Sequence, residues 1–240
     1  MTRFILLIVC VPALIFWSGC GGKEEAEEPA PEPSTPAKVD PINFGSATFG
    51  SVTDIDGNTY KTVVIGGATW MAENLRTTKF KNGDPIAKLT EGASWLQATG
   101  PGYFAYDDNT SMISVYGHLY NGHTKNDSRG ACPSGWHVAS PTDWNAIASA
   151  LGGAGAAGGR MKEQGTSHWV TINTADNASG FSGVPGGSMY KGKLTDLGTD
   201  GYWWCTTEGD FFYLTNNQSD LRHKNTAVVT EGLSIRCVKD

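Results

Sequence analysis

The sequence contains few of the patterns that indicate catalysis or nucleic-acid binding. Its 240 residues hold no P-loop, no His-Glu-x-x-His pair, no Cys-x-x-Cys pair and no Ser-His-Asp spacing. Basic side chains number 18 against 24 acidic ones, and they form no stripe that could follow a phosphate backbone. The five histidines are scattered along the chain, at positions 118, 123, 137, 168 and 223. We therefore expect no enzyme activity, no cofactor, no metal cluster and no nucleic-acid partner.

Cysteine occurs only five times, and its first two positions lie in the N-terminal segment. Arg3 precedes an apolar run to Trp17 that is too short for a stable membrane span and is typical of a signal peptide. Residues 17–20, Trp-Ser-Gly-Cys, resemble the lipobox of bacterial lipoproteins, in which Leu usually stands at the position of Trp17. This resemblance implies removal of residues 1–19, a diacylglyceryl thioether on Cys20 and a further acyl chain such as palmitate. The alternative is ordinary signal cleavage with an unmodified Cys20.

Residues 20–42 lack aromatic side chains and hydrophobic periodicity. Residues 21–40 carry six carboxylates and two lysines, interrupted by prolines. Such a segment buries too little apolar surface to offset its conformational entropy, so we expect a disordered, acidic, proline-rich tether. Gly21 follows Cys20 where the inner-membrane retention signal of Gram-negative lipoproteins has Asp. We therefore expect a lipid-anchored protein of the outer membrane that faces the cell exterior.

Residues 43–240 are long enough for a single domain with its own core. The Asp56-Gly57 pair predicts a hairpin over residues 51–67, since this pair favours a two-residue turn. Asp54, Asp56 and Asn58 could alternatively hold calcium through their closely spaced oxygen atoms. The glycine and glutamate of the EF-hand pattern do not follow at the required positions, however. Asn82-Gly83 predicts a second hairpin, and we expect Trp70 and Leu75 to lie in the core.

Two aromatic segments, residues 102–108 and 114–121, combine β-prone side chains with Asn, Asp and Gly. Aromatic rings beside hydrogen-bonding groups are what a sugar-binding face needs, because a pyranose stacks on a ring and its hydroxyls need partners. The same composition is also typical of the core of a small twisted sheet. We interpret both segments as strands and expect a short helix across residues 91–98.

A helix is predicted to begin after Ser140. Ser140 can cap the helix, Pro141 suits its first position, and the Asp143 carboxylate can return to the cap N–H. The apolar residues recur at helical spacing, at Trp144, Ile147, Ala148 and Leu151. Gly152-Gly153 should end the helix, and the alanine and glycine run of residues 152–159 is interpreted as a flexible loop.

The remaining chain alternates short β-prone segments with glycine-rich turns, which indicates an α+β domain. Once Cys10 is removed and Cys20 is acylated, three cysteines remain: Cys132, Cys205 and Cys237. In an exported protein we expect two of them to form a disulfide and one to be left over.

A series of motifs in this domain resembles the Fibrobacter succinogenes major paralogous (FISUMP) domain, a module of bacterial exported proteins. The motifs cover about residues 54–240 and occur in the family's order: Asp56-Gly57-Asn58-x-Tyr60, Ile65-Gly66, Trp70-Met71-Ala72-Glu73-Asn74-Leu75, Tyr116-Gly117-x-Leu119-Tyr120, Cys132-Pro133-x-Gly135-Trp136-His137-Val138, Trp144, Gly180-Phe181-Ser182, Pro185-Gly186-Gly187, Trp203 and Gly232-x-Ser234-Ile235-Arg236-Cys237. The pattern is in turn similar to C-type lectin-like and formylglycine-generating sulfatase-modifying domains.

These resemblances imply a C-type lectin-like fold, with mostly short antiparallel strands, long loops and one or two helices. They also imply a disulfide between Cys132 and Cys237. Cys205 would then be the odd thiol, a small buried hydrophobe at a position where the family usually has Ser. The sulfatase-modifying enzymes use a pair of cysteines that hold copper, and only Cys205 would be free here, so the resemblance does not imply catalysis.

By analogy with C-type lectin-like folds, the ligand face would be formed by loops between Gly187 and the last strand. The candidates are aromatic platforms and hydrogen-bonding groups: Trp203, Tyr213, Asn216, Asn217, Asp220, Arg222 and His223. The calcium-lectin signatures Glu-Pro-Asn and Trp-Asn-Asp are absent. We predict a non-catalytic domain that binds a glycan or a surface protein.

Two alternatives remain at this stage. The Asn-rich segment 213–225 could be the variable surface of a C-type lectin-like receptor diversified by a retroelement. The domain could instead be a structural or assembly protein of the cell envelope that binds only other proteins.

Overall fold

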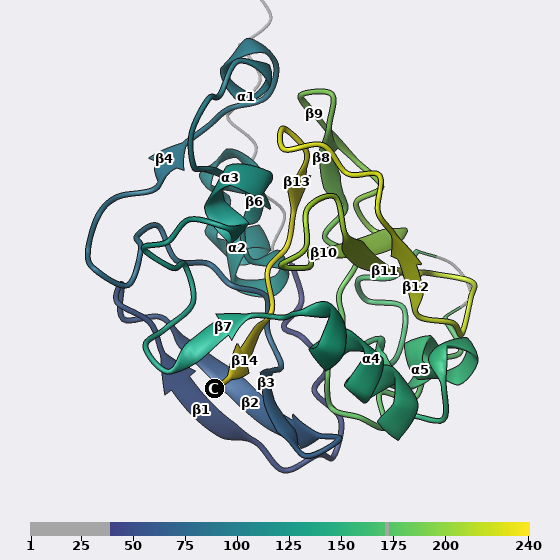
Figure 1. Ribbon diagram of the computed structural model, residues 1–240. Helices are drawn as coiled ribbons and strands as arrows, with labels where there is room; N and C mark the ends of the chain where they lie inside the picture. The colour runs from purple at the N-terminus through teal and green to yellow at the C-terminus, as the bar shows by residue number, and fades with distance from the viewer. Residues whose placement is uncertain (1–38, 171–172) are drawn as a thin grey trace, which may run out of the picture. The chain divides into compact units, whose positions relative to one another are not determined.

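The computed structural model describes residues 39–170 and 173–240 (Figure 1). The predicted signal peptide, the lipidation site at Cys20 and the tether up to residue 38 lie outside these residues. Among the described residues, no helix combines the length and the apolar character needed to cross a membrane.

A five-stranded antiparallel sheet contains the predicted Asp56-Gly57 hairpin. Its strands follow the order β1 (Gly50–Thr53), β2 (Thr59–Ile65), β3 (Ala68–Met71), β14 (Cys237–Lys239) and β7 (Trp136–Val138). The hairpin pairs Val52 with Tyr60, and Gly57 adopts a positive φ of 85° in the turn. The hairpin prediction is confirmed.

The Asp54 carboxylate is used within the hairpin turn. It accepts hydrogen bonds from the backbone N–H groups of Asp56 and Asn58, both at 2.9 Å, and from the Tyr60 hydroxyl at 2.6 Å. An Asx turn of this kind fixes the loop from inside. The Asn82-Gly83 segment also turns back on itself, but only one antiparallel bridge, between Lys79 and Pro85, closes it.

A six-stranded sheet follows the order β4 (Ala87–Lys88), β5 (Gly102–Phe104), β6 (Leu119–Asn121), β13 (Gly232–Leu233), β8 (Ser188–Tyr190) and β9 (Lys193–Thr195). All neighbours are antiparallel except β4 and β5. The C-terminal segment, yellow in Figure 1, runs from β13 in this sheet to β14 in the five-stranded one. The C-terminal residues 232–239 therefore contribute strands to two sheets.

The prediction that residues 114–121 form one strand is wrong in its first half. Helix α2 (Thr110–Tyr116) occupies it, after a 3-10 turn η1 (Tyr106–Asp108). The Asn109 side chain caps this helix by accepting hydrogen bonds from the N–H groups of Ser111 and Met112. The Asn109 cap at the start of the helix and Gly117 at its C-terminal end favour the helix over the strand that the β-prone residues 114–116 predicted.

The predicted helix after Ser140 is confirmed as α4 (Pro141–Ala150), with both hydrogen bonds of the capping box. The predicted loop 152–159 is instead mostly helix α5 (Ala154–Met161). Gly158 allows a close contact here, because a Cβ atom at this position would lie 2.3 Å from the Asp220 carbonyl oxygen. The described residues thus hold five short α-helices rather than one or two, the others being α1 (Ala93–Leu96) and α3 (Gly122–Lys125).

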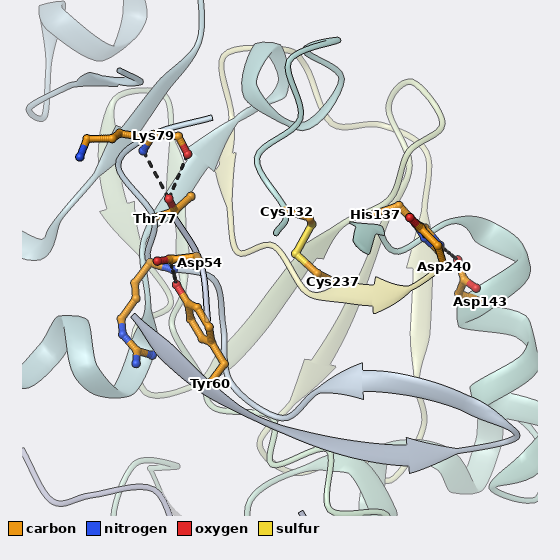
Figure 2. Close-up of a disulfide and its surroundings, with 10 residues drawn as sticks. Asp54, Tyr60, Thr77, Lys79, Cys132, His137, Asp143, Cys237 and Asp240 are labelled. Carbon is orange, nitrogen blue, oxygen red and sulfur yellow. Dashed lines mark hydrogen bonds and ion pairs between the residues drawn. A yellow bond between two sulfur atoms is a disulfide. The ribbon is translucent and has the colours of Figure 1, made fainter. Parts of the chain in front are cut away.

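Arg236 crosslinks the core beside the predicted disulfide. Its fully buried guanidinium donates hydrogen bonds to the Asn74 side chain and to three carbonyl oxygens, those of Met71, Phe181 and Ser182, at 2.6–3.2 Å. Cys132 and Cys237 form the expected disulfide (Figure 2). Cys205 is a free, buried thiol, and Trp70 and Leu75 are core residues, as expected.

The segment before β1 is held by a buried ion pair. The Nδ1 atom of His168 lies 2.6 Å from the Glu163 carboxylate, and its Nε2 atom lies 2.8 Å from the carbonyl oxygen of Asp40. The other Glu163 oxygen accepts a hydrogen bond from the Asn43 N–H at 2.6 Å. The start of the described chain is thereby fastened to the loop after α5. The α+β class is confirmed by these elements, and the C-type lectin-like fold stays a prediction.

Candidate functional site

The candidate site lies on the three-stranded antiparallel sheet β10 (Asp200–Trp204), β11 (Phe211–Thr215) and β12 (Arg222–Lys224). Side chains alternate between the two faces of a strand, so residues opposite each other in the register share a face. On one face, Tyr202, Tyr213 and Arg222 form a row, and the next row consists of the buried Trp204 and Phe211 with the exposed Lys224. The sheet thus presents aromatic rings and cationic side chains together.

A cavity of about 280 Å³ opens where this face meets the β8–β9 hairpin and the chain leading into β13. We call it the aromatic pocket. Its lining residues are Ser188, Tyr190, Thr195, Asp196, Tyr202, Phe211, Lys224, Thr226, Glu231 and Leu233. Tyr190 is about half exposed, at 46 % of its surface. The pocket therefore joins apolar rings to carboxylate, hydroxyl and ammonium groups.

Tyr202 forms the wall of the aromatic pocket and sits between two carboxylates. Its hydroxyl lies 3.2 Å from the Asp196 carboxylate and 3.1 Å from that of Asp200. Burial and these two carboxylates raise the pKa of Tyr202 far above its usual value. Burial also raises the pKa of Asp200, whose Oδ1 atom is buried without a hydrogen-bond partner. Tyr202 is thus a neutral hydroxyl with two carboxylate acceptors for its single proton.

The Tyr213 ring continues the aromatic surface and lies under two cations. It stacks on Tyr202 with ring centroids 5.7 Å apart and an interplanar angle of 24°. The Lys224 ammonium and the Arg222 guanidinium lie 5.3 Å and 5.9 Å from its ring centroid. Arg222 also donates from Nε to the Asp220 carboxylate at 2.7 Å. Three of the predicted candidates, Tyr213, Asp220 and Arg222, are therefore brought together beside the pocket.

Trp203 does not fit its predicted role as an exposed platform. It is fully buried on the opposite face of β10, where its indole N–H donates to the Asn74 side chain at 2.8 Å. His223 lies on that same opposite face, against Phe212 and 3.4 Å from the Asp210 carboxylate. Both positions follow from strand alternation, which places them one residue out of phase with Tyr202 and Lys224.

The candidates Asn216 and Asn217 lie in the turn after β11. This turn is held from below by Lys162, a buried side chain whose ammonium donates to the carbonyl oxygens of Thr215, Asn216 and Gln218 at 2.6–2.9 Å. Burial lowers the pKa of Lys162 to about 8. The Asn217 side chain itself is exposed at the surface.

Sequence reasoning missed Tyr190, Asp196, Tyr202 and Lys224. Tyr202 and Lys224 could have been found by pairing the Tyr213 strand with its neighbours, since period-2 alternation then places all three on one face. Asp196 and Tyr190 reach the site through the β8–β9 hairpin, whose position next to β10 no local pattern encodes. No group of three or more histidine, cysteine or acidic residues in the described part of the chain is arranged to hold a metal ion.

His137 lies outside the site, at the edge of the five-stranded sheet in β7. Figure 2 shows it beside Asp240 and Asp143, with distances of 2.7 Å and 3.2 Å between its ring nitrogens and their carboxylates. Partial burial lowers the pKa of His137, but the two carboxylates outweigh it and raise the pKa above its usual value. His137 thereby connects β7 to the first turn of α4 and to the C-terminal residue.

Comparison with known families matches residues 63–239 to the model described as the Fibrobacter succinogenes major domain. The chain belongs to this family. The match includes every residue of the aromatic pocket and both cysteines of the disulfide, so these are parts of the Fibrobacter major domain. Strand β1 and the segment before it precede the matched region. No curated protein and no solved structure matches the chain.

Proposed function

We propose that this protein is a lipid-anchored bacterial surface protein whose Fibrobacter major domain binds glycan, without catalysis, through the aromatic pocket. The observation that carries the proposal is the stacked pair Tyr202 and Tyr213, which lies beside the carboxylates of Asp196 and Asp200. Aromatic rings can pack against the C–H faces of a pyranose, and carboxylates can accept hydrogen bonds from its hydroxyls. The ammonium of Lys224 supplies a donor at the same pocket.

The pocket is organised before any ligand arrives. The Tyr202 hydroxyl has a carboxylate acceptor on either side, and the Arg222–Asp220 contact holds Arg222 in the row with Tyr202 and Tyr213. A fixed site loses less conformational entropy on binding, which favours affinity for a small polar ligand. The α+β arrangement and a disulfide that reaches the last strand are compatible with the predicted C-type lectin-like fold, which we retain as part of the proposal.

The test is a glycan and cell-wall polysaccharide array probed with the full-length protein, with and without EDTA. We expect binding that falls at least about tenfold in Tyr190→Ala and Lys224→Ala, the loss of about 1.4 kcal/mol in binding free energy. His223→Ala is the matched control, because it changes the neighbouring residue of β12 on the other face. A blank array from folded protein would contradict glycan binding and favour a surface-protein ligand. Loss of binding in EDTA would add a metal to the site.

A diversified receptor surface is a second candidate, supported by how the turn after β11 is held. Within this turn, Lys162 donates to backbone carbonyl oxygens, those of Thr215, Asn216 and Gln218, so the exposed side chains of Asn217 and Gln218 can change while these hydrogen bonds are kept. A near-copy of the coding sequence for residues 213–225 beside the gene would support this candidate. Its absence from the neighbouring genomic sequence would count against it.

A further inference from the structure

A second cavity lies between the Asp56-Gly57 hairpin, the chain after β3 and the segment from β5 to β6. Its volume is about 390 Å³, within the range of about 300–1,000 Å³ that small-molecule sites occupy. We call it the His118 pocket. Its lining residues are Asp56, Asn58, Arg76, Thr78, Tyr103, Ala105, Asp108, Ile113 and His118. None of them lines the aromatic pocket.

Two buried rings line this pocket. His118 is 4 % exposed and Tyr103 is 8 % exposed, and their ring centroids are 4.6 Å apart. The His118 Nδ1 atom is buried without a hydrogen-bond partner. Burial lowers the pKa of His118 to about 4, so the ring is neutral near pH 7. An unpartnered imidazole at the wall of an open cavity is costly to maintain unless a ligand or water pairs with it.

The charged side chains that line the His118 pocket are all paired with residues of opposite charge. Asp56 lies 3.0 Å from the Lys79 ammonium, and Arg76 lies 3.2 Å from the Glu73 carboxylate. The exposed carboxylate of Asp108 at the rim pairs with Lys88. A ligand with a net charge would therefore find no uncompensated partner, whereas a neutral ligand would meet amide, hydroxyl, imidazole and guanidinium groups.

The wall on the hairpin side is rigid. The Asp56 carboxylate accepts hydrogen bonds from the Thr78 N–H at 2.6 Å and from the hydroxyls of Thr78 and Thr77 at 3.0 Å and 3.1 Å. The Tyr60 hydroxyl accepts a hydrogen bond from the Arg76 N–H at 3.0 Å while it donates to Asp54. Figure 2 shows Asp54, Tyr60 and Thr77 in this region. These contacts hold Asp56 and the backbone of Arg76 in place independently of any ligand.

We propose that the His118 pocket is a separate binding site for a neutral, hydroxyl-rich small ligand, a single sugar unit being the fitting class, with His118 as a hydrogen-bonding contact. Neutral imidazole offers one donor and one acceptor, which matches a sugar hydroxyl. The inference does not rest on the aromatic pocket, because the two pockets share no lining residue. If both sites are occupied, the domain binds two sugar units at once.

The test follows the His118 ring by ¹H–¹⁵N NMR in the full-length protein during titration with single sugars. The neutral probes are glucose, galactose and N-acetylglucosamine, and the charged probes are glucosamine and glucuronate. We expect a saturable shift of the His118 ring signals with at least one neutral probe and an affinity at least about tenfold lower for its charged counterpart. If no neutral probe shifts the ring signals, or if a charged probe binds as tightly, the proposal is overturned.

Two variants separate this site from the aromatic pocket. His118→Phe keeps an aromatic ring and removes both nitrogens. In this variant the affinity is read from the backbone amide signal of Tyr103, which lines the same pocket, and we expect it to fall at least about tenfold for the neutral probe. Lys224→Ala changes the aromatic pocket and should leave this affinity unchanged. The wild-type ring titration remains decisive if His118→Phe fails to fold. A loss in Lys224→Ala alone would assign the sugar to the aromatic pocket and overturn the second site.

Discussion

The guanidinium of Arg236 shows how one residue can join distant parts of the chain. It contacts Asn74 after β3 and the carbonyl oxygens of Phe181 and Ser182, and it lies 4.3 Å from the Phe181 ring centroid. Burial lowers the pKa of Arg236 to about 9. A buried charge of this kind is tolerated because each side of it is hydrogen-bonded. The sequence motif ending in Arg236-Cys237 indicated a strand, but not this role.

We expect Arg236→Met to lower the free energy of unfolding by about 3–5 kcal/mol. Removing the guanidinium leaves the carbonyl groups of Met71 and Phe181 buried without a donor. Urea denaturation monitored by tryptophan fluorescence measures the loss. Arg222→Met is the control, because Arg222 is only partly buried and bonded to a neighbour. Equal urea midpoints for the wild type and Arg236→Met would contradict the crosslinking role.

The buried pair of His168 and Glu163 makes stability depend on pH. Burial lowers the pKa of His168, but the hydrogen bond and charge of Glu163 outweigh it and raise the pKa above its usual value. A raised pKa in the folded state means that protonated His168, paired with the Glu163 carboxylate, stabilises the fold below about pH 6.5. This contribution is lost as the pH rises through the folded-state pKa.

Glu163→Gln should therefore flatten the pH dependence. We expect the urea midpoint of the wild type to fall between pH 6 and pH 8 by more than that of the variant. Hydrogen exchange of the Asn43 amide should also rise in Glu163→Gln, since this carboxylate accepts its hydrogen bond. His137→Gln is the comparison, because His137 is a partly exposed histidine with carboxylate partners elsewhere. If the urea midpoint of Glu163→Gln changes with pH as that of the wild type does, the His168–Glu163 pair is not the source of the pH dependence.

At the scale of elements, the structure separates what neighbouring residues determine from what packing determines. The Asp56-Gly57 hairpin and the Ser140 cap were predictable because each signal lies within a few residues. Helix α5 was not, because glycine disfavours helices and the helix is held by tertiary contacts, among them those with residues 219–221 and with the loop over residues 176–183. None of the predicted candidates lines the aromatic pocket, and Tyr213, Asp220 and Arg222 lie beside it. Tyr213 and Arg222 could be named from their segment, but the faces of Trp203 and His223 depend on strand pairing.

The glycines of α5 provide a matched test of this packing. Gly158→Ala should destabilise the domain by about 1–3 kcal/mol, because its Cβ would lie 2.3 Å from the Asp220 carbonyl oxygen. Gly155→Ala faces open space, so we expect stability to be unchanged or raised by up to about 1 kcal/mol. Thermal denaturation of both variants measures the difference. If both substitutions raise stability, α5 does not pack closely on the chain before β12.

At the scale of the whole molecule, the Cys132–Cys237 disulfide joins two positions that lie far apart in the sequence. Cys132 and Cys237 are separated by 105 positions, and closing a loop of that order removes about 4–5 kcal/mol of unfolded-state entropy in the simplest account. We expect Cys132→Ala with Cys237→Ala to lower the free energy of unfolding by about 2–5 kcal/mol in urea. Cys205→Ala keeps the disulfide and should cost much less. A double variant as stable as the wild type would contradict this account.

The central places of β13 and β14 have a consequence for the order of assembly. β13 lies between β6 and β8, and β14 lies between β3 and β7, so the interiors of two sheets come from residues 232–239. While the chain is being synthesised, neither sheet can close until these residues have emerged, however much of the domain is already present. The chain before them must therefore wait unfolded or partly folded.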